Sequence, residues 1–299
     1  MQSLAGGGGG AAEVRAVVIP PAVDLRRFDP ARPHSDSGID SDRDREADVS
    51  MRRLCGLDPA AGSEPVFPGQ TDDFFPCILI GFVGRLDPGE TYGGLHRLLR
   101  FPSYASSLRL LEKSPGLFLQ AAYEILQRYP YARFLVLGDG SLGAHLRELA
   151  VRLGMQAAVL FAGMVAPAAL PSLLRRLHMV VNPSLIYETF CISNIEAMSM
   201  QLPLITFAVG GIGEYVAEPG HSDSQQPSSA FSVAANAVVV NSAQPKAIAV
   251  AVHFLIEHPE VRLAIGRAAR RTVESFYSVE RQMRQYEELY SSLVPLQNP

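Results

Sequence analysis

Short apolar runs alternate with helical patterns along most of this 299-residue chain, and that alternation limits the possible folds more than any other feature. The expected strands cover residues 77–83, 132–137, 158–161, 179–181, 203–207 and 237–241. Expected helices lie between them, at 115–130, 142–153, 168–177, in the segment that carries Glu196, and at 212–216. Such alternation predicts a parallel sheet with right-handed crossovers and helices on both faces. We therefore expect a doubly wound, Rossmann-like α/β domain with a helical C-terminal end over 246–257, 259–276 and 279–293.

The flanking segments differ in composition from this domain. Residues 1–13 include a run of five glycines and should be flexible. Residues 14–76 form a linker-like and low-complexity segment, which starts as a strand at Val14 and is stopped by Pro20 and Pro21. The domain itself spans 77–293, with insertions at about 87–111 and 217–235, and 294–299 form a tail.

Composition excludes several classes of protein. With 26 Lys and Arg against 30 Asp and Glu, a net charge of -4 gives no general attraction to nucleic acid or acidic lipid. The three cysteines are far apart, which argues against a disulfide framework and a zinc site. No apolar run approaches the length of a membrane span, so we expect no integral membrane segment and a cytoplasmic location. Asp40 and Asp42 have metal-ligand spacing but no flanking strand, so we expect no metal site.

The stretch from Tyr187 to Met200, YETFCISNIEAMSM, follows the expected strand at 179–181 and a short turn. A helix is expected to begin just beyond Glu188, and the unpaired amides of its first turn suit a phosphate. Glu188 would stand before those amides and Glu196 about two turns into the helix. Taken alone, the pair is better explained by Glu188 as a helix cap and Glu196 as a solvated carboxylate, so the surrounding motifs decide.

Other candidate binding residues also fall at the expected ends of strands. Arg85 follows the strand at 77–83, and Lys113 precedes the next helix, so both cations are expected near a diphosphate. Gly211 and Glu214 follow the strand at 203–207, where glycine lets the backbone approach a ligand. The run GDGSLG from Gly138 has the letters of a dinucleotide fingerprint but lacks the acid about twenty residues later, so a tight turn is favoured over NAD binding.

Residues 14–293 resemble the nucleotide-sugar-binding, C-terminal half of glycosyltransferase family 4, the glycosyl transferases group 1 of GT-B fold. The motifs that carry the resemblance are IPPAVDLRRFDP, GFVGRLD, EKSPGLFLQAA, FLVLGDG, VLFAGMV and VNPSLIYETFCISNIEAMSMQLPLITFAVGGIGEYV. The resemblance implies a retaining, metal-independent glycosyltransferase whose donor is a UDP- or GDP-sugar, with no further cofactor.

The resemblance also implies roles for single residues. Arg85 and Lys113 would hold the donor diphosphate, and Glu188 would approach the transferred sugar. Glu196 would bind the donor ribose. The remaining expected contacts come from the backbone: amides near Thr189 and Phe190 for the phosphates, and Gly163, Met164 and Val165 for the nucleobase.

Two departures from the family limit what it implies. The insertion at 87–111 separates Arg85 from Lys113, and the family's N-terminal, acceptor-binding domain has no counterpart in the sequence. The chain is therefore expected to be the donor-binding half of a hexosyltransferase-type enzyme. The alternative is a non-catalytic nucleotide-sugar-binding module, or a truncated remnant, that needs a partner chain. The apolar stripe of the helix at 279–293 would then contact a separate acceptor-binding domain or a second copy of the chain.

Overall fold

The computed structural model of the protein describes residues 17–31, 50, 54, 78–87, 113–216 and 230–293. The glycine-rich start, Asp40 and Asp42, nearly all of the insertion at 87–111 and the tail at 294–299 lie outside the described residues. The expectations for those segments therefore remain predictions.

The described residues form one mostly parallel sheet of seven strands in the order β3-β2-β1-β4-β5-β7-β6. The strands are β1 (Ile78–Val83), β2 (Ala132–Leu137), β3 (Val159–Gly163), β4 (Met179–Asn182), β5 (Leu204–Thr206), β6 (Phe231–Val233) and β7 (Ala237–Val240). Every pairing is parallel except that of β6 with β7. The doubly wound α/β fold expected from the alternation is confirmed.

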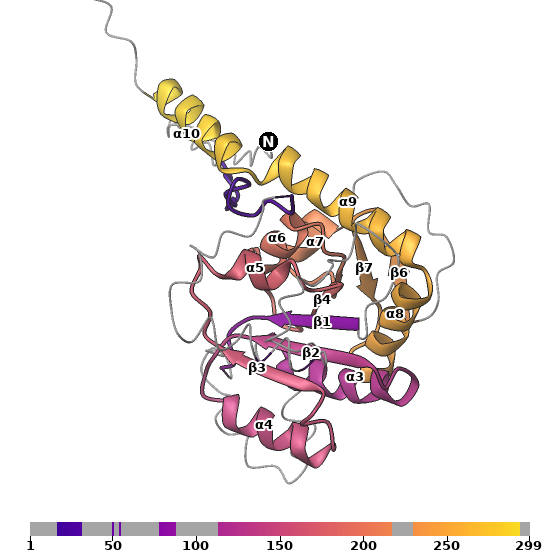
Figure 1. The fold of residues 1–299 in the computed structure, drawn as a ribbon. Coiled ribbons are helices and arrows are strands. Elements are labelled where there is room, and N and C mark those ends of the chain that lie inside the picture. The colour runs from indigo at the N-terminus through magenta and orange to yellow at the C-terminus, as the bar shows by residue number, and fades with distance from the viewer. Residues whose placement is uncertain are drawn as a thin grey trace, which may run out of the picture.

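Helices cover both faces of the sheet (Figure 1). One face packs against α3 (Pro115–Arg128), α4 (Gly143–Arg152) and α8 (Pro245–Glu257). The other packs against α5 (Leu170–Leu174), α6 (Ile192–Ser199), α7 (Ile212–Val216) and α9 (Pro259–Phe276). Successive strand residues point to opposite faces, so Leu79 of β1 belongs to one core cluster while Ile80 and Phe82 belong to the other. This two-sided burial explains why the strands read as continuous apolar runs.

The strand order reverses between β1 and β4. From β1 the chain adds β2 and β3 on one side, then crosses to β4 and continues through β5 to β7 on the other. In open α/β sheets, ligands bind beyond the carboxyl ends of the strands at such a reversal point. The loops that follow β1 and β4 are therefore the first place to look for a site.

Three local expectations differ from the structure. The strand expected from Val14 up to Pro20 is not formed in its described part, residues 17–19, and Val23 makes only an isolated bridge to Ser278. Strand β6 lies within the segment expected to be the insertion at 217–235, where its three residues gave too little pattern to recognise. The helix expected at 168–177 is limited to Leu170–Leu174.

The last helix, α10 (Val279–Leu293), extends beyond the layered body beside segment 17–31 (Figure 1). The Gln282 amide donates to the Pro20 carbonyl at 2.7 Å, but no residue of α10 is buried. Met283, Tyr290 and Leu293 are 52%, 62% and 66% exposed. Within the described residues, no helix combines the length and the apolar character that crossing a membrane requires.

Gly138 holds together the loops that follow three neighbouring strands. Its N–H donates to the Gly163 carbonyl at 2.8 Å, and a Cβ at Gly138 would overlap the Gly84 carbonyl oxygen. The backbone also has φ 141°, a conformation that favours glycine. The run GDGSLG thus serves as a close backbone contact after β2.

We predict that Gly138→Ala destabilises the fold by roughly 2 to 4 kcal/mol, because backbone strain and overlap act together. The matched control is Gly154→Ala: Gly154 has φ 69° but nothing within 4 Å of an added Cβ, so only the strain of about 1 to 2 kcal/mol applies. Urea unfolding of both variants measures the difference. Equal losses of stability would contradict the overlap.

Candidate functional site

The loops at the carboxyl edge of the sheet are bonded to one another. The Gly84 N–H after β1 donates to the Leu137 carbonyl at the end of β2, at 2.9 Å. The Leu86 N–H donates to the Asp139 carbonyl at 3.0 Å. These bonds, together with the Gly138 contact described above, fix the loops after β1, β2 and β3 as one surface. The candidate residues that these loops carry therefore share one edge of the sheet.

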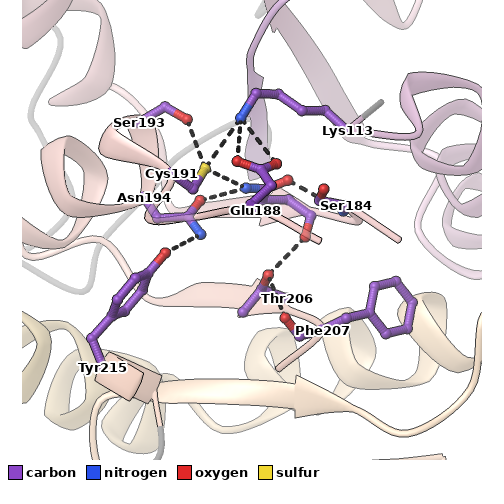
Figure 2. A network of polar contacts seen from close by, with 10 residues as sticks. Lys113, Ser184, Glu188, Cys191, Ser193, Asn194, Thr206, Phe207 and Tyr215 are labelled. Carbon is purple, nitrogen blue, oxygen red and sulfur yellow. Dashed lines mark hydrogen bonds and ion pairs between the residues drawn. The ribbon is translucent and has the colours of Figure 1, made fainter. Parts of the chain in front are cut away.

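The main ion pair at this edge joins Lys113 to Glu188. The Lys113 Nζ lies 3.1 Å from Glu188 Oε1, 3.0 Å from Oε2 and 3.2 Å from the Cys191 Sγ (Figure 2). The two side chains are only 14% and 10% exposed. Burial alone would lower the pKa of the Lys113 amine, but the neighbouring Cys191 and Glu188 outweigh it and hold that pKa above its ordinary value. Lys113 is therefore a charged amine held close to the end of β4.

Arg85 directly follows a residue that lies against the Lys113 side chain. It is exposed at the end of β1, and a Cβ added at the preceding residue, Gly84, would lie 2.5 Å from the Lys113 Cδ. The Lys113 side chain thus crosses the residue next to Arg85. The long segment between Asp87 and Lys113 has not carried the lysine away from this loop.

A buried polar network supports the Glu188 loop from below (Figure 2). The Asn182 Nδ2, at the end of β4, donates to the Asn194 Oδ1 at 2.7 Å and contacts the Cys191 Sγ at 3.0 Å. The Asn194 amide in turn donates to the Tyr215 hydroxyl at 2.9 Å. The Thr206 hydroxyl of β5 donates to the Asn182 carbonyl at 2.9 Å. These bonds lock β4, α6 and α7 into one arrangement.

The helix after Glu188 begins later than expected. Its N-cap is Cys191, with φ 61°, and its first residue is Ile192, so a start just beyond Glu188 is wrong. Thr189 is exposed and Phe190 half-buried in an irregular loop before the helix. The Phe190 ring packs against Tyr215 and Tyr277, with centroids 5.6 and 5.3 Å apart. The left-handed residue and this aromatic cluster keep the loop out of the helix.

The loop after β5 packs directly on the Glu188 loop. The Gly211 N–H donates to the Glu188 carbonyl at 2.8 Å, and a Cβ on Gly211 would overlap the Thr189 carbonyl. Gly211 is buried, so the absence of a side chain at this position serves packing within the chain as much as the approach of a ligand. Glu214 is exposed in the first turn of α7.

The expected nucleobase contacts lie at the end of β3. Gly163 has φ 71° and ends the strand, while Met164 is 65% exposed and Val165 half-buried. An exposed methionine beside a turn leaves both an apolar side chain and backbone groups open to a flat ligand. The role of these three residues remains a prediction.

Glu196 lies one turn into α6, since the helix starts at Ile192, and not two turns as expected. Burial raises the pKa of its carboxyl from 4.5 to about 7, against the opposing charge of Arg27. Arg27 belongs to segment 17–31, so the charge of this segment acts on the carboxylate that the family resemblance assigns to the donor ribose.

The Glu196 pKa predicts a pH dependence of stability. A folded-state pKa above the unfolded value means that the folded protein holds an extra proton between about pH 4.5 and 7. The contribution of Glu196 to the free energy of unfolding should therefore fall as pH rises through this window, by up to about 1.4 kcal/mol per pH unit, while the buried His178, whose pKa is lowered to about 4, contributes in the opposite direction. Glu196→Gln should remove this fall in urea unfolding at pH 5 and pH 7.5. Glu148→Gln, at an exposed position of α4, is the control and should retain it; a Glu196 variant that also retains it would contradict the assignment.

Sequence reasoning misses the residues that organise the site. The sequence pattern places Asn182 in a turn and assigns no role to Cys191, Asn194 or Tyr215. A polar residue directly after a buried strand is the available signal for Asn182. The other contacts join positions 9 to 78 residues apart, which no local pattern reveals. Within the described residues, no three His, Cys, Asp or Glu side chains are grouped to hold a metal ion.

Comparison with known proteins connects this geometry to a family. The family model for glycosyl transferases group 1 matches residues 103–258. A D-inositol 3-phosphate glycosyltransferase from Corynebacterium urealyticum is 27% identical over 288 residues, which cover 94% of this chain and 52% of that protein. The chain thus spans about half the length of this relative.

Solved structures show the same fold. Anabaena HepE, solved in complex with UDP and glucose, superposes with a TM-score of 0.59 at 19% identity, over 92% of this chain and 56% of HepE. The C-terminal domain of LpcC from Francisella tularensis superposes with a TM-score of 0.52 at 19% identity, over 86% of this chain and 99% of that domain.

The fold and the loops at its carboxyl edge define a Rossmann-like domain of the kind that forms the C-terminal half of a GT-B protein. The family match covers more than half of the sequence. The chain belongs to the glycosyl transferases group 1.

Proposed function

We propose that this chain is the donor-binding half of a retaining glycosyltransferase that uses a nucleotide-diphosphate sugar. The observation that carries the proposal is the charged Lys113 side chain against Gly84, the residue before Arg85, where the strand order reverses. That is where open α/β sheets bind ligands, and the two cations suit a diphosphate. The names of the relatives support glycosyl transfer, and the UDP bound to HepE supports a nucleoside-diphosphate donor.

The proposed chemistry is electrostatic. As the bond between sugar and diphosphate breaks, negative charge develops on the leaving phosphate, and fixed cations stabilise that charge. Lys113 and Arg85 would do this without a metal, assisted by the amides near Thr189 and Phe190. Glu188 would approach the transferred sugar, Glu196 the ribose and the turn at Gly163 the base. The acceptor would bind on a second domain that closes over the sugar and excludes water.

The donor class is tested by thermal unfolding in the presence of UDP, GDP, ADP and their glucose or mannose conjugates. A ligand that binds only the folded state raises the unfolding temperature in a concentration-dependent way. Stabilisation by at least one of these nucleotides is expected. No stabilisation by any of them at millimolar concentration would contradict donor binding.

The two cations give a second prediction. Arg85→Ala and Lys113→Ala should each weaken binding of the stabilising nucleotide by about 1 to 3 kcal/mol, as loss of a charge-assisted hydrogen bond does. Titration calorimetry measures the effect. Arg128→Ala is the matched control, because Arg128 pairs with Glu257 on the surface between α3 and α8 and should leave affinity unchanged. Unchanged affinity in both site variants would remove these residues from the donor site.

The second candidate function is a nucleotide-sugar-binding module that acts only with a partner chain. The exposed face of α10 favours it, because Met283, Tyr290 and Leu293 are left open to solvent. Sugar transfer assays distinguish the two candidate functions. If the chain is a module that needs a partner, it should hydrolyse or transfer the sugar slowly or not at all by itself. A separate acceptor-binding polypeptide or a second copy of the chain should then restore activity. The proposal also includes a cytoplasmic setting, in which the free thiol of Cys191 stays reduced.

A further inference from the structure

Lys113 has all of its hydrogen-bonding capacity occupied within the chain. An ammonium group has three donors, and the Lys113 Nζ contacts both carboxylate oxygens of Glu188 and the Cys191 Sγ at 3.0 to 3.2 Å. The side chains of Lys113 and Glu188 are only 14% and 10% exposed, so the ion pair is largely shielded from solvent. A phosphate that reaches this amine must therefore replace a partner that is already bound.

The backbone around this contact is held in a rare conformation. Four non-glycine residues in the described part of the chain have positive φ, and three of them are Lys113 (54°), Ser114 (44°) and Cys191 (61°). Each such residue costs on the order of 1 to 2 kcal/mol, so the surrounding contacts must hold Lys113 and Cys191 in place. Strained backbone is therefore found at the amine and at one of its three contacts, and such strain is common at ligand sites and switch regions.

A diphosphate and the Glu188 carboxylate compete for the same cation. Placed together they repel, because like charges at contact distance disfavour each other. If Glu188 leaves, its carboxylate loses a charged partner in a shielded place, which is costly unless new hydrogen bonds form. At its outer phosphate, a free nucleoside diphosphate offers only the phosphate oxygens, which accept hydrogen bonds. A nucleotide sugar also brings the sugar hydroxyls to that position, and these can donate hydrogen bonds.

We propose that Glu188 closes the phosphate-binding amine of Lys113 by occupying it until a donor binds, and that the hydroxyls of a donor sugar, rather than the diphosphate alone, release it. This inference rests on the proposed function. Glu188 then acts as a discriminating residue: it favours the intact donor over the free nucleoside diphosphate that remains after transfer. The same exchange helps the spent diphosphate to leave, because Glu188 returns to Lys113.

The test compares two ligands on matched variants of the full chain. UDP and UDP-glucose, or GDP and GDP-mannose if that pair gives the larger stabilisation, are titrated calorimetrically into the wild type and Glu188→Gln. The wild type should bind the nucleotide sugar more tightly than the free nucleotide. Glu188→Gln should bind the free nucleotide roughly tenfold more tightly than the wild type and lose the preference for the sugar.

Glu257→Gln is the control, because it removes an ion-paired carboxylate away from the site, the partner of Arg128. It should leave the affinities for the free nucleotide and for the nucleotide sugar unchanged. In a Lys113→Ala background, Glu188→Gln should no longer tighten nucleotide binding, because the amine that it frees is gone. Glu188→Ala serves as a second variant, in case a glutamine still bonds Lys113 or fails to fold.

The outcomes separate the two proposals. Nucleotide binding that is unchanged or weaker in both Glu188 variants would overturn the closed-amine proposal while donor binding stands. The closed-amine proposal would also be overturned if the wild type bound the free nucleotide as tightly as the nucleotide sugar. Absence of any nucleotide binding by the wild type and by every variant would overturn the proposed function, and the closed amine with it.

Discussion

The reversal of strand order between β1 and β4 determines where chemistry can occur in this domain. Crossovers from β1 run to one side of the sheet and those from β4 to the other, so no helix connection covers the loops that leave these two strands. The cations come from the β1 side of this point and the carboxylates from the β4 side. The Lys113 to Glu188 contact at 3.0 Å is therefore a consequence of topology as much as of side-chain chemistry.

A charged pair in such a shielded place needs support, and the Asn182 network supplies it. Asn182 is 1% exposed, and its amide holds the first turn of α6 through Asn194. Because Asn194 also bonds Tyr215, the position of Cys191 is set from both β4 and α7. Buried polar groups in a satisfied network specify a single arrangement. The network thus keeps the Sγ of Cys191 at the amine while the Glu188 loop above it stays irregular.

The sequence predicted the layered fold because each prediction needed only local information. Period and length separate strands from helices, and alternation then implies a parallel sheet. The errors arose where tertiary contacts override local preference: the aromatic packing of Phe190 delays the start of α6, and three residues of β6 form a strand only because β7 is beside them. The candidate site was predictable as a set of strand-end residues. Its central contact was not, since nothing in the sequence shows that Lys113 meets Glu188 and Cys191.

The separation of Arg85 from Lys113 illustrates why a long insertion need not disturb a site. Closing a longer loop costs little extra, about 0.6 kcal/mol for each doubling of its length. What matters is whether the ends are fixed. On one side, Asp87 accepts hydrogen bonds from the Ser141 N–H and hydroxyl at 2.7 and 3.0 Å. On the other, Lys113 is held by Glu188 and Cys191 and continues directly into α3. With both ends anchored to loops of the same edge, the length between them has little effect on where the amine lies. This is why residues on the two sides of a long insertion can still lie at one edge of the sheet.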